Sequence, residues 1–255
     1  MADEPDYGID APGLVRGFFF AGGIGSALVA SVVMLIGLAH AWQWILLALV
    51  VVGSAYALGL GHLMLYCSKF YKIRNRERLL DTIQWTGSET ALDVGCGSGL
   101  MLIGVANRTP SGRSIGIDLW AAKDQSRNRQ ETTVENARRE RVSDRVEVKT
   151  GDMRNLPFDD ASFDVIVSHW AVHNVPSEAD RRLALGEMTR VLKLGGQVLI
   201  ADITNQDGYA TAMRDLGLID IRRIGPGCVE RIYGLMSFGR FRPSAVFARK
   251  ADRVD

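Results

Sequence analysis

A glycine-rich segment near the middle of the chain limits the possible folds most strongly. Residues 91–99 read Ala-Leu-Asp-Val-Gly-Cys-Gly-Ser-Gly, so an apolar run leads to a carboxylate and glycines follow at every second position. Glycines just past a buried strand permit a tight turn and let a ligand approach the backbone. In open parallel sheets, ligands bind at this carboxyl edge. The segment therefore predicts an α/β sheet with a ligand site around Gly95, Gly97 and Gly99.

The sequence after this segment alternates between strand-like and helix-like stretches. The predicted strands lie at 90–94, 114–117, 146–150, 163–168, 197–203, 219–224 and 245–249. The predicted helices follow Gly99 and lie at 122–141, 178–192 and 209–216, with a further amphipathic helix at 69–85 before the first strand. Strands separated by crossover helices form a mostly parallel, doubly wound, Rossmann-like sheet.

Carboxylates follow two successive strands behind the glycine segment. Asp118, roughly 20 residues past that segment, is placed to accept hydrogen bonds from a ribose diol. Leu119 and Trp120 are placed to cover one face of an adenine, and Asp152 is placed to accept from its amino group. Each carboxylate alone is also typical of a helix cap. Two of them behind one glycine turn favour a nucleoside-bearing cofactor.

The glycine spacing distinguishes this site from a dinucleotide site. The dinucleotide fingerprint is G-x-G-x-x-G, whereas residues 95–99 read G-x-G-x-G and residues 100–102 are Leu-Met-Leu. The chain also has no Tyr-x-x-x-Lys motif of the short-chain dehydrogenases. A nicotinamide cofactor is therefore the less favoured alternative.

Several motifs together carry a resemblance to a known family. In chain order they are residues 93–99, 116–118, 151–152 with 156–158, 162–168 and 190–196. As an ordered set they resemble the class I S-adenosylmethionine (SAM) dependent methyltransferases. The small-molecule branch, with the ubiquinone/menaquinone, sterol and tocopherol methyltransferases, is the most similar. Leu194 stands where that family usually has proline, in a turn outside the catalytic region.

The resemblance implies a seven-stranded sheet with an antiparallel last strand, SAM as cofactor and S-adenosyl-L-homocysteine as product. It assigns Asp93 and the glycine turn to the methionine end of SAM, Asp118 to the ribose, and Asp152 with Met153 to the adenine. The expected cofactor-binding residues are Asp93, Gly95, Cys96, Gly97, Ser98, Gly99, Asp118, Leu119, Trp120, Asp152, Met153 and Ser168.

Two histidines follow the fourth predicted strand, where the resemblance puts the methyl acceptor. Methyl transfer mainly requires that the acceptor be positioned, and a base is needed only for a protonated nucleophile. His173 is the expected base or orienting group, with His169 second. The alternative is a histidine that only caps the next helix. No His, Cys, Asp and Glu set has metal-ligand spacing, so no metal is expected.

The first part of the chain is apolar and nearly free of charge. Residues 18–39 and 41–67 contain no Asp, Glu, Lys or Arg, and each run exceeds the roughly 20 residues that cross a bilayer. The expected organisation is a mobile acidic tail (1–17), two transmembrane helices (about 18–39 and 42–66, within 18–67) and a methyltransferase domain (68–255). A secretory signal peptide or buried core helices are the alternatives.

Small residues and basic residues suggest how such a hairpin is arranged. Gly22, Ser26 and Ala30 share one helix face, and Gly53, Ala57 and Gly61 share another, so the two faces are expected to pair in an antiparallel register. A basic cluster follows the second run: Lys69, Lys72, Arg74, Arg76 and Arg78. The positive-inside rule then places the domain and both termini in the cytoplasm, with the cluster at anionic headgroups.

The expected function combines these parts. A pocket that opens toward the membrane favours a lipophilic acceptor: a quinone, an isoprenoid, a sterol-like molecule or a lipid headgroup. The loop 225–243, with apolar and aromatic residues among arginines, is expected to be a lid that touches the headgroups. A methyltransferase for proteins or soluble small molecules, and a non-catalytic SAM-binding scaffold, are the alternatives. The net charge of +1 gives no reason to expect nucleic acid.

Overall fold

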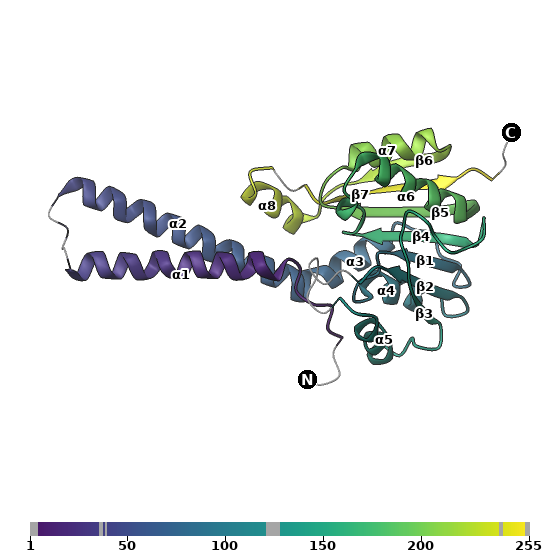
Figure 1. Ribbon diagram of the computed structural model, residues 1–255, viewed down its shortest axis with the longest axis horizontal. Helices are drawn as coiled ribbons and strands as arrows, with labels where there is room; N and C mark the ends of the chain where they lie inside the picture. The colour runs from purple at the N-terminus through teal and green to yellow at the C-terminus, as the bar shows by residue number, and fades with distance from the viewer. Residues whose placement is uncertain (1–4, 36–37, 39, 121–127, 240–241, 253–255) are drawn as a thin grey trace.

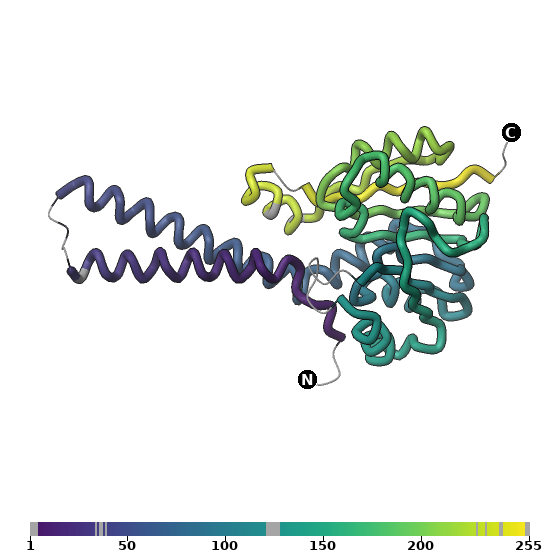
Figure 2. Tube along the Cα trace, viewed as in Figure 1, coloured from purple at the N-terminus to yellow at the C-terminus, as the bar shows by residue number. Residues whose placement is uncertain are grey.

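The chain forms a long helical hairpin joined to an α/β domain, as seen in the computed structural model (Figure 1). The structure describes residues 5–35, 38, 40–120, 128–239 and 242–252. Figure 2 shows the path of the chain: the hairpin comes first, and the sheet with its helices follows at the hairpin's base.

The hairpin consists of α1 (Pro12–Leu35) and α2 (Ala41–Tyr66). A π-helical turn, Cys67–Tyr71, joins α2 directly to α3 (Lys72–Leu80), so the second apolar helix runs without a break into the domain. The first helix, α1, begins at Pro12 and ends at Leu35, so it lies earlier in the chain than the span predicted at about 18–39. The helix predicted at 69–85 is the continuation of α2. It ends at Leu80 because the chain turns there, and the Trp85 indole N–H donates to the Leu80 carbonyl at 2.9 Å.

The contact between α1 and α2 differs from the predicted register. A Cβ on Gly22 would lie 2.5 Å from Leu58 Cγ, and a Cβ on Gly25 would lie 2.0 Å from Ser54 Oγ. These glycines let the two backbones approach closely. Gly53, a predicted interface residue, has no atom within 4 Å of its Cβ position. The predicted pairing is wrong there because the helices diverge toward their connecting end (Figure 1).

Most of the hairpin surface is apolar and exposed. Both helices have the length and apolar composition that a membrane span requires, and only 11% and 17% of their apolar windows are buried. Phe20, Leu49 and Val52 are each more than 60% exposed. Contiguous apolar surface of this kind marks a contact with a membrane or a partner protein.

Residues 5–10, before α1, pack against the domain and do not form the mobile tail that their acidic composition predicts. Tyr7 is only 4% exposed. Its carbonyl accepts hydrogen bonds from Ser98 Oγ at 3.0 Å and Lys72 Nζ at 2.7 Å. Asn136 exchanges two hydrogen bonds with the backbone of Asp6. These partners are distant in sequence, so composition could not reveal them.

The basic cluster after α2 is divided between the interior and the surface. Lys69 and Arg74 are exposed. Lys72 and Arg76 are buried, and Arg76 lies 3.4 Å from Glu140. The expectation that the whole cluster meets lipid headgroups is therefore wrong, because two of its members hold the domain together.

The domain is built on a seven-stranded sheet in the order β3-β2-β1-β4-β5-β7-β6. The strands are β1 (Thr90–Val94), β2 (Arg113–Asp118), β3 (Val146–Thr150), β4 (Phe163–His169), β5 (Leu192–Asp202), β6 (Leu218–Ile224) and β7 (Ser244–Lys250). β7 runs antiparallel to both β5 and β6, and the pairs among β1 to β5 are parallel. The predicted doubly wound sheet with an antiparallel last strand is confirmed.

Helices cover both faces of this sheet. They are α4 (Leu100–Arg108), α5 (Gln130–Arg139), α6 (Glu178–Val191) and α7 (Gln206–Asp215). Leu92 and Ile166 pack with side chains of α6 and α7, whereas Ala91 and Val165 pack with α3 and α4. This alternation follows from the two-residue period of a strand. Residues 122–127 of the helix predicted at 122–141 lie outside the described residues.

The predicted lid, 225–243, contains a short helix, α8 (Cys228–Met236). Figure 1 shows α8 on the side of the sheet from which the hairpin extends. Residues 240 and 241 of this segment lie outside the described part of the chain.

Candidate active site

A cavity of about 650 Å³ lies where the hairpin meets the carboxyl ends of the strands. Its size is within the roughly 300–1,000 Å³ of ordinary ligand pockets. Asp93 and Asp118 line it from β1 and β2, and His169 lines it from the end of β4. Leu14 and Met64 line it from the base of the hairpin. The cavity therefore touches both parts of the chain.

The glycine turn forms one wall of the cavity. Gly95 donates its N–H to the Ile117 carbonyl at 2.8 Å, which fixes the turn against β2. Gly95 has a φ of +76°, and a Cβ there would lie 2.2 Å from the Cβ of Ala171. No other residue type fits this position without displacing the chain. Cys96 and Ser98 also line the cavity, but both are buried within the turn.

Asp93 is a buried carboxylate with unused hydrogen-bonding capacity. Its Oδ2 accepts from the Leu102 amide at 2.8 Å, while its Oδ1 has no partner among the described residues. Burial raises the pKa of Asp93 to about 8; the Leu102 hydrogen bond opposes this shift and the Asp118 charge adds to it. A cation bound in the cavity would pair with Oδ1 and favour the ionised form.

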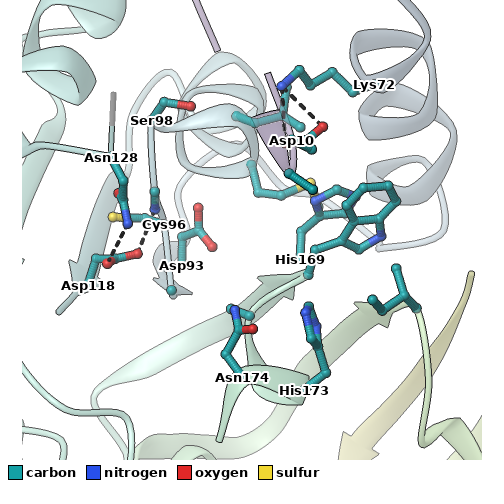
Figure 3. Close-up of a pocket in the computed structure, with 18 of the residues that line it drawn as sticks. Asp10, Lys72, Asp93, Cys96, Ser98, Asp118, Asn128, His169, His173 and Asn174 are labelled. Carbon is teal, nitrogen blue, oxygen red and sulfur yellow. Dashed lines mark hydrogen bonds and ion pairs between the residues drawn. The ribbon is translucent and has the colours of Figure 1, made fainter. Parts of the chain in front are cut away.

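Asp118 lies on the opposite side of the glycine turn from the histidines (Figure 3). Its Oδ2 accepts from the Gly97 amide at 2.8 Å, and its Oδ1 accepts from the Trp120 amide at 2.6 Å. Asn128 donates to Oδ1 at 3.4 Å. These contacts hold the carboxylate at the cavity wall, where Oδ2, which accepts from one donor, retains a lone pair for a ligand. Leu119, beside it, is exposed and lines the cavity.

Asp152 and Met153 line the cavity beyond the end of β3. Asp152 accepts from the Arg154 guanidinium at 2.6 Å and from the Arg154 amide at 2.9 Å. The Arg154 side chain lowers the pKa of Asp152, so this carboxylate is ionised and accepts hydrogen bonds.

Three of the expected cofactor residues are not brought to the cavity wall. Gly99 is the N-cap residue of α4 and has a φ of +89°. The Trp120 indole donates to Thr150 Oγ1 at 2.8 Å. Ser168 is fully buried and donates to the Val94 carbonyl at 2.7 Å. Their contacts shape the strand ends, which is a structural role that spacing in the sequence does not distinguish from ligand contact.

His169 lies in the wall of the cavity, stacked on Trp170 with ring centroids 5.1 Å apart (Figure 3). Its Nε2 has no partner among the described residues. Burial lowers the pKa of His169 to about 4, so the ring is neutral near pH 7. Trp170 has a φ of +53°, a conformation that costs energy for a side chain of this size.

His173 is held by a carboxylate that the sequence analysis missed. Its Nδ1 lies 2.5 Å from Asp202 Oδ1, and its amide donates to Asp202 Oδ2 at 2.9 Å. Asp202 is fully buried at the end of β5 and also accepts from the Tyr209 hydroxyl at 2.9 Å. With Nδ1 bound to a carboxylate, Nε2 is left as the ring nitrogen available to a ligand.

Other residues at the cavity were also missed. They are Asp10, Tyr71, Asn128, Asn174 and Glu230, which all line the cavity. Asp202 was recognisable, because it ends a predicted strand as Asp118 does. Asp10, Tyr71 and Glu230 come from segments with no recognisable motif, and only the tertiary structure brings them to the site.

Comparison with known proteins identifies the domain. Residues 92–200 match the family described as "Methyltransferase domain". Methyltransferase GfsG of Streptomyces halstedii is 35% identical over 143 residues, which are 55% of this chain and 48% of the relative. Demethylmenaquinone methyltransferase of Lactobacillus johnsonii is 30% identical over 128 residues, or 50% and 49% of the two chains. The chain spans about half the length of these curated relatives.

Solved structures show the same fold. Geranyl diphosphate C-methyltransferase of Streptomyces coelicolor, solved with Mg²⁺, geranyl diphosphate and S-adenosyl-L-homocysteine, superposes with a TM-score of 0.56 at 19% identity. The match covers 70% of this chain and 79% of that one. The [4+2]-cyclase SpnF gives a TM-score of 0.55 at 18% identity, with coverages of 70% and 81%.

Proposed function

Because residues 92–200 are a domain of the SAM-dependent methyltransferase family, we propose that the chain is a membrane-anchored methyltransferase acting on a lipophilic small molecule. A quinone, an isoprenoid, a sterol-like molecule or a lipid headgroup would suit this site. The observation that carries the proposal is one cavity lined both by the cofactor-type carboxylates Asp93 and Asp118 and by the hairpin residues Leu14 and Met64.

The residues at the strand ends fit SAM. The unpartnered Oδ1 of Asp93 suits the ammonium of its methionine part, and Asp118 suits the ribose diol. The ionised Asp152 suits the adenine amino group. Met153, the next residue, also lines the cavity and suits contact with the adenine ring. A Cβ at Gly95 would lie 2.2 Å from the Cβ of Ala171, so glycine is needed to keep the turn at this wall of the cavity. Bound SAM supplies an electrophilic methyl group to this cavity.

The histidines suit the acceptor side. Asp202 fixes the His173 ring, so its Nε2 can take a proton from an acceptor hydroxyl as the oxygen or activated carbon is methylated. His169 is neutral and held by its stacking on Trp170, so it suits an orienting hydrogen bond rather than proton removal.

The relatives and the surface support a lipophilic acceptor and a membrane location. One relative bears the name demethylmenaquinone methyltransferase, and a structural neighbour holds geranyl diphosphate. The exposed hairpin, which has no charged side chain after Arg16, supports two membrane spans. The exposed Lys69 and Arg74 at its base support a cytoplasmic domain with both termini on the same side.

The test uses the full chain in its membrane. Purified enzyme in vesicles receives methyl-labelled SAM and a total membrane lipid extract, with His173→Ala as the inactive control. Label that partitions into organic solvent supports the proposal. Label that stays with protein or with water-soluble compounds would overturn the lipophilic acceptor. SAM binding without transfer of label to any fraction would indicate a scaffold.

A further inference from the structure

The helix α8 has one polar, buried side and an exposed side that is apolar apart from Arg231. Glu230 is 6% exposed, lies in the cavity wall and accepts a hydrogen bond from the Tyr71 hydroxyl at 2.5 Å. On the outer side, Ile232 is 48% exposed, Leu235 is 79% exposed and Phe238, just past the helix, is 89% exposed. An apolar strip on a short helix whose polar side is fixed inward is typical of a helix lying in a membrane interface.

Contacts with α2 place this strip beside the apolar hairpin. The Tyr56 hydroxyl donates to the Met236 carbonyl, and the Tyr56 and Phe238 rings lie 6.2 Å apart. Tyr56 lies ten residues before Tyr66, the end of α2, and therefore about 15 Å along the helix from that end. Phe238 thus meets α2 inside its apolar stretch and not at its charged base.

The apolar surface of α8 is continuous with that of α2. Val52, one helical turn from Tyr56, is 66% exposed. The medium that covers Val52 is therefore also expected to cover Phe238, because the contact of Tyr56 with Met236 and Phe238 joins the two surfaces. If the hairpin spans a bilayer, that medium is lipid hydrocarbon.

We propose that α8 is a third membrane-inserted element and that, with the base of the hairpin, it frames a lateral entrance from the bilayer to the cavity. Val229 and Glu230 of α8 line the same cavity as Leu14 and Met64 of the hairpin. A lipophilic acceptor can pass between these two walls without entering water. The inference rests on the anchoring in the proposed function and adds the route by which the acceptor arrives.

Photocrosslinking tests the insertion directly and requires no turnover. The full chain carries benzoylphenylalanine at position 238 in vesicles of phosphatidylcholine and phosphatidylglycerol. The matched control carries it at Leu194, which is 49% exposed near the start of β5, the opposite end of that strand from Asp202. Lipid adducts at 238 well above those at 194 are expected. Equal adducts, or adducts to a second copy of the chain, would overturn the inference.

Substitution of the strip tests the entrance. The pair Leu235→Asp and Phe238→Asp should slow label transfer into a lipid extract in vesicles about tenfold, because two large apolar side chains leave the lipid. The dissociation constant of SAM should change less than twofold. Leu183→Asp, at a 58% exposed leucine of α6, is the control and should change neither quantity. A normal transfer rate in the double variant would contradict the lateral entrance.

The two experiments separate the inference from the function on which it rests. Absence of label transfer in the unaltered chain would count against the acceptor class, while lipid adducts at 238 would still support insertion of α8. Normal transfer in the unaltered chain without such adducts would leave the enzyme intact and refute the insertion.

Discussion

Titration of Asp93 should control how tightly the chain binds SAM. Asp93 is 2% exposed, one of its oxygens has no partner in the described part of the chain, and burial raises its pKa from 3.8 to about 8. The ammonium and sulfonium charges of SAM stabilise a carboxylate but not a neutral carboxylic acid. We therefore expect SAM to bind the ionised form.

The size of the effect follows from the distance between the pKa and the assay pH. At pH 6, two units below a pKa of about 8, about 1% of the cofactor-free chains carry an ionised Asp93, against about half at pH 8. About half of the SAM molecules have also lost their ammonium charge at pH 8, so the dissociation constant of SAM should be about 25-fold larger at pH 6 than at pH 8. This corresponds to about 2 kcal/mol of binding free energy. Calorimetric titration of the detergent-solubilised full chain between pH 6 and pH 9 measures the change.

Asp93→Asn is the matched control, because the α-amino group of SAM itself titrates near pH 8. The variant keeps the titration of the cofactor and loses that of the protein, so its affinity should not improve between pH 6 and pH 8. A change of less than about threefold in the unaltered chain over this range, or the same slope in the variant, would refute the reasoning.

The same group gives a stability effect of known sign. A carboxyl whose pKa is raised on folding contributes stability that is fully present below its unfolded pKa, near 3.8, and is lost as the pH rises through about 8. Between about pH 4 and pH 8, the melting temperature of the cofactor-free chain should therefore fall relative to that of Asp93→Asn, and saturating SAM should reduce this relative fall.

Three further predictions concern the acceptor side, the ribose site and the hairpin. His173→Ala should lower turnover about 100-fold with SAM affinity unchanged, and Asp202→Asn should lower it at least about tenfold because the ring loses its orienting carboxylate; steady-state kinetics with calorimetry check both. Asp118→Ala should weaken SAM binding about 10- to 100-fold, since hydrogen bonds to a charged group contribute about 1.5–3 kcal/mol; near-normal affinity would argue against a ribose contact. Gly25→Leu should lower the melting temperature of the hairpin, measured by circular dichroism in detergent, whereas Gly53→Leu should not, and equal effects would contradict the helix contact described above.

The sheet and half of the site were predictable because their signals are local. Apolar runs ending in Asp93 and Asp118 mark strands with their carboxyl ends at one edge, and the glycines mark the turn between strand and helix. Asp202 carries the same local signal and was overlooked. The burial of Tyr7 was not predictable, because it depends on Ser98, 91 positions along the chain. The absence of Gly53 from the contact between α1 and α2 was likewise not predictable, because it depends on how far the two helices separate along their whole length.

The burial of Tyr7 makes the anchor inseparable from the nucleotide pocket. Residues 5–10 reach the glycine turn first, and the chain then leaves through both apolar helices before returning as α3. A soluble fragment that starts at α3 would uncover Ser98 and deprive Lys72 of two backbone acceptors. Loss of activity in such a fragment would report a damaged pocket as much as a missing membrane. Replacing residues 12–66 with a water-soluble helical hairpin keeps residues 5–10 in place against the glycine turn. That variant therefore separates the contribution of lipid from damage to the pocket.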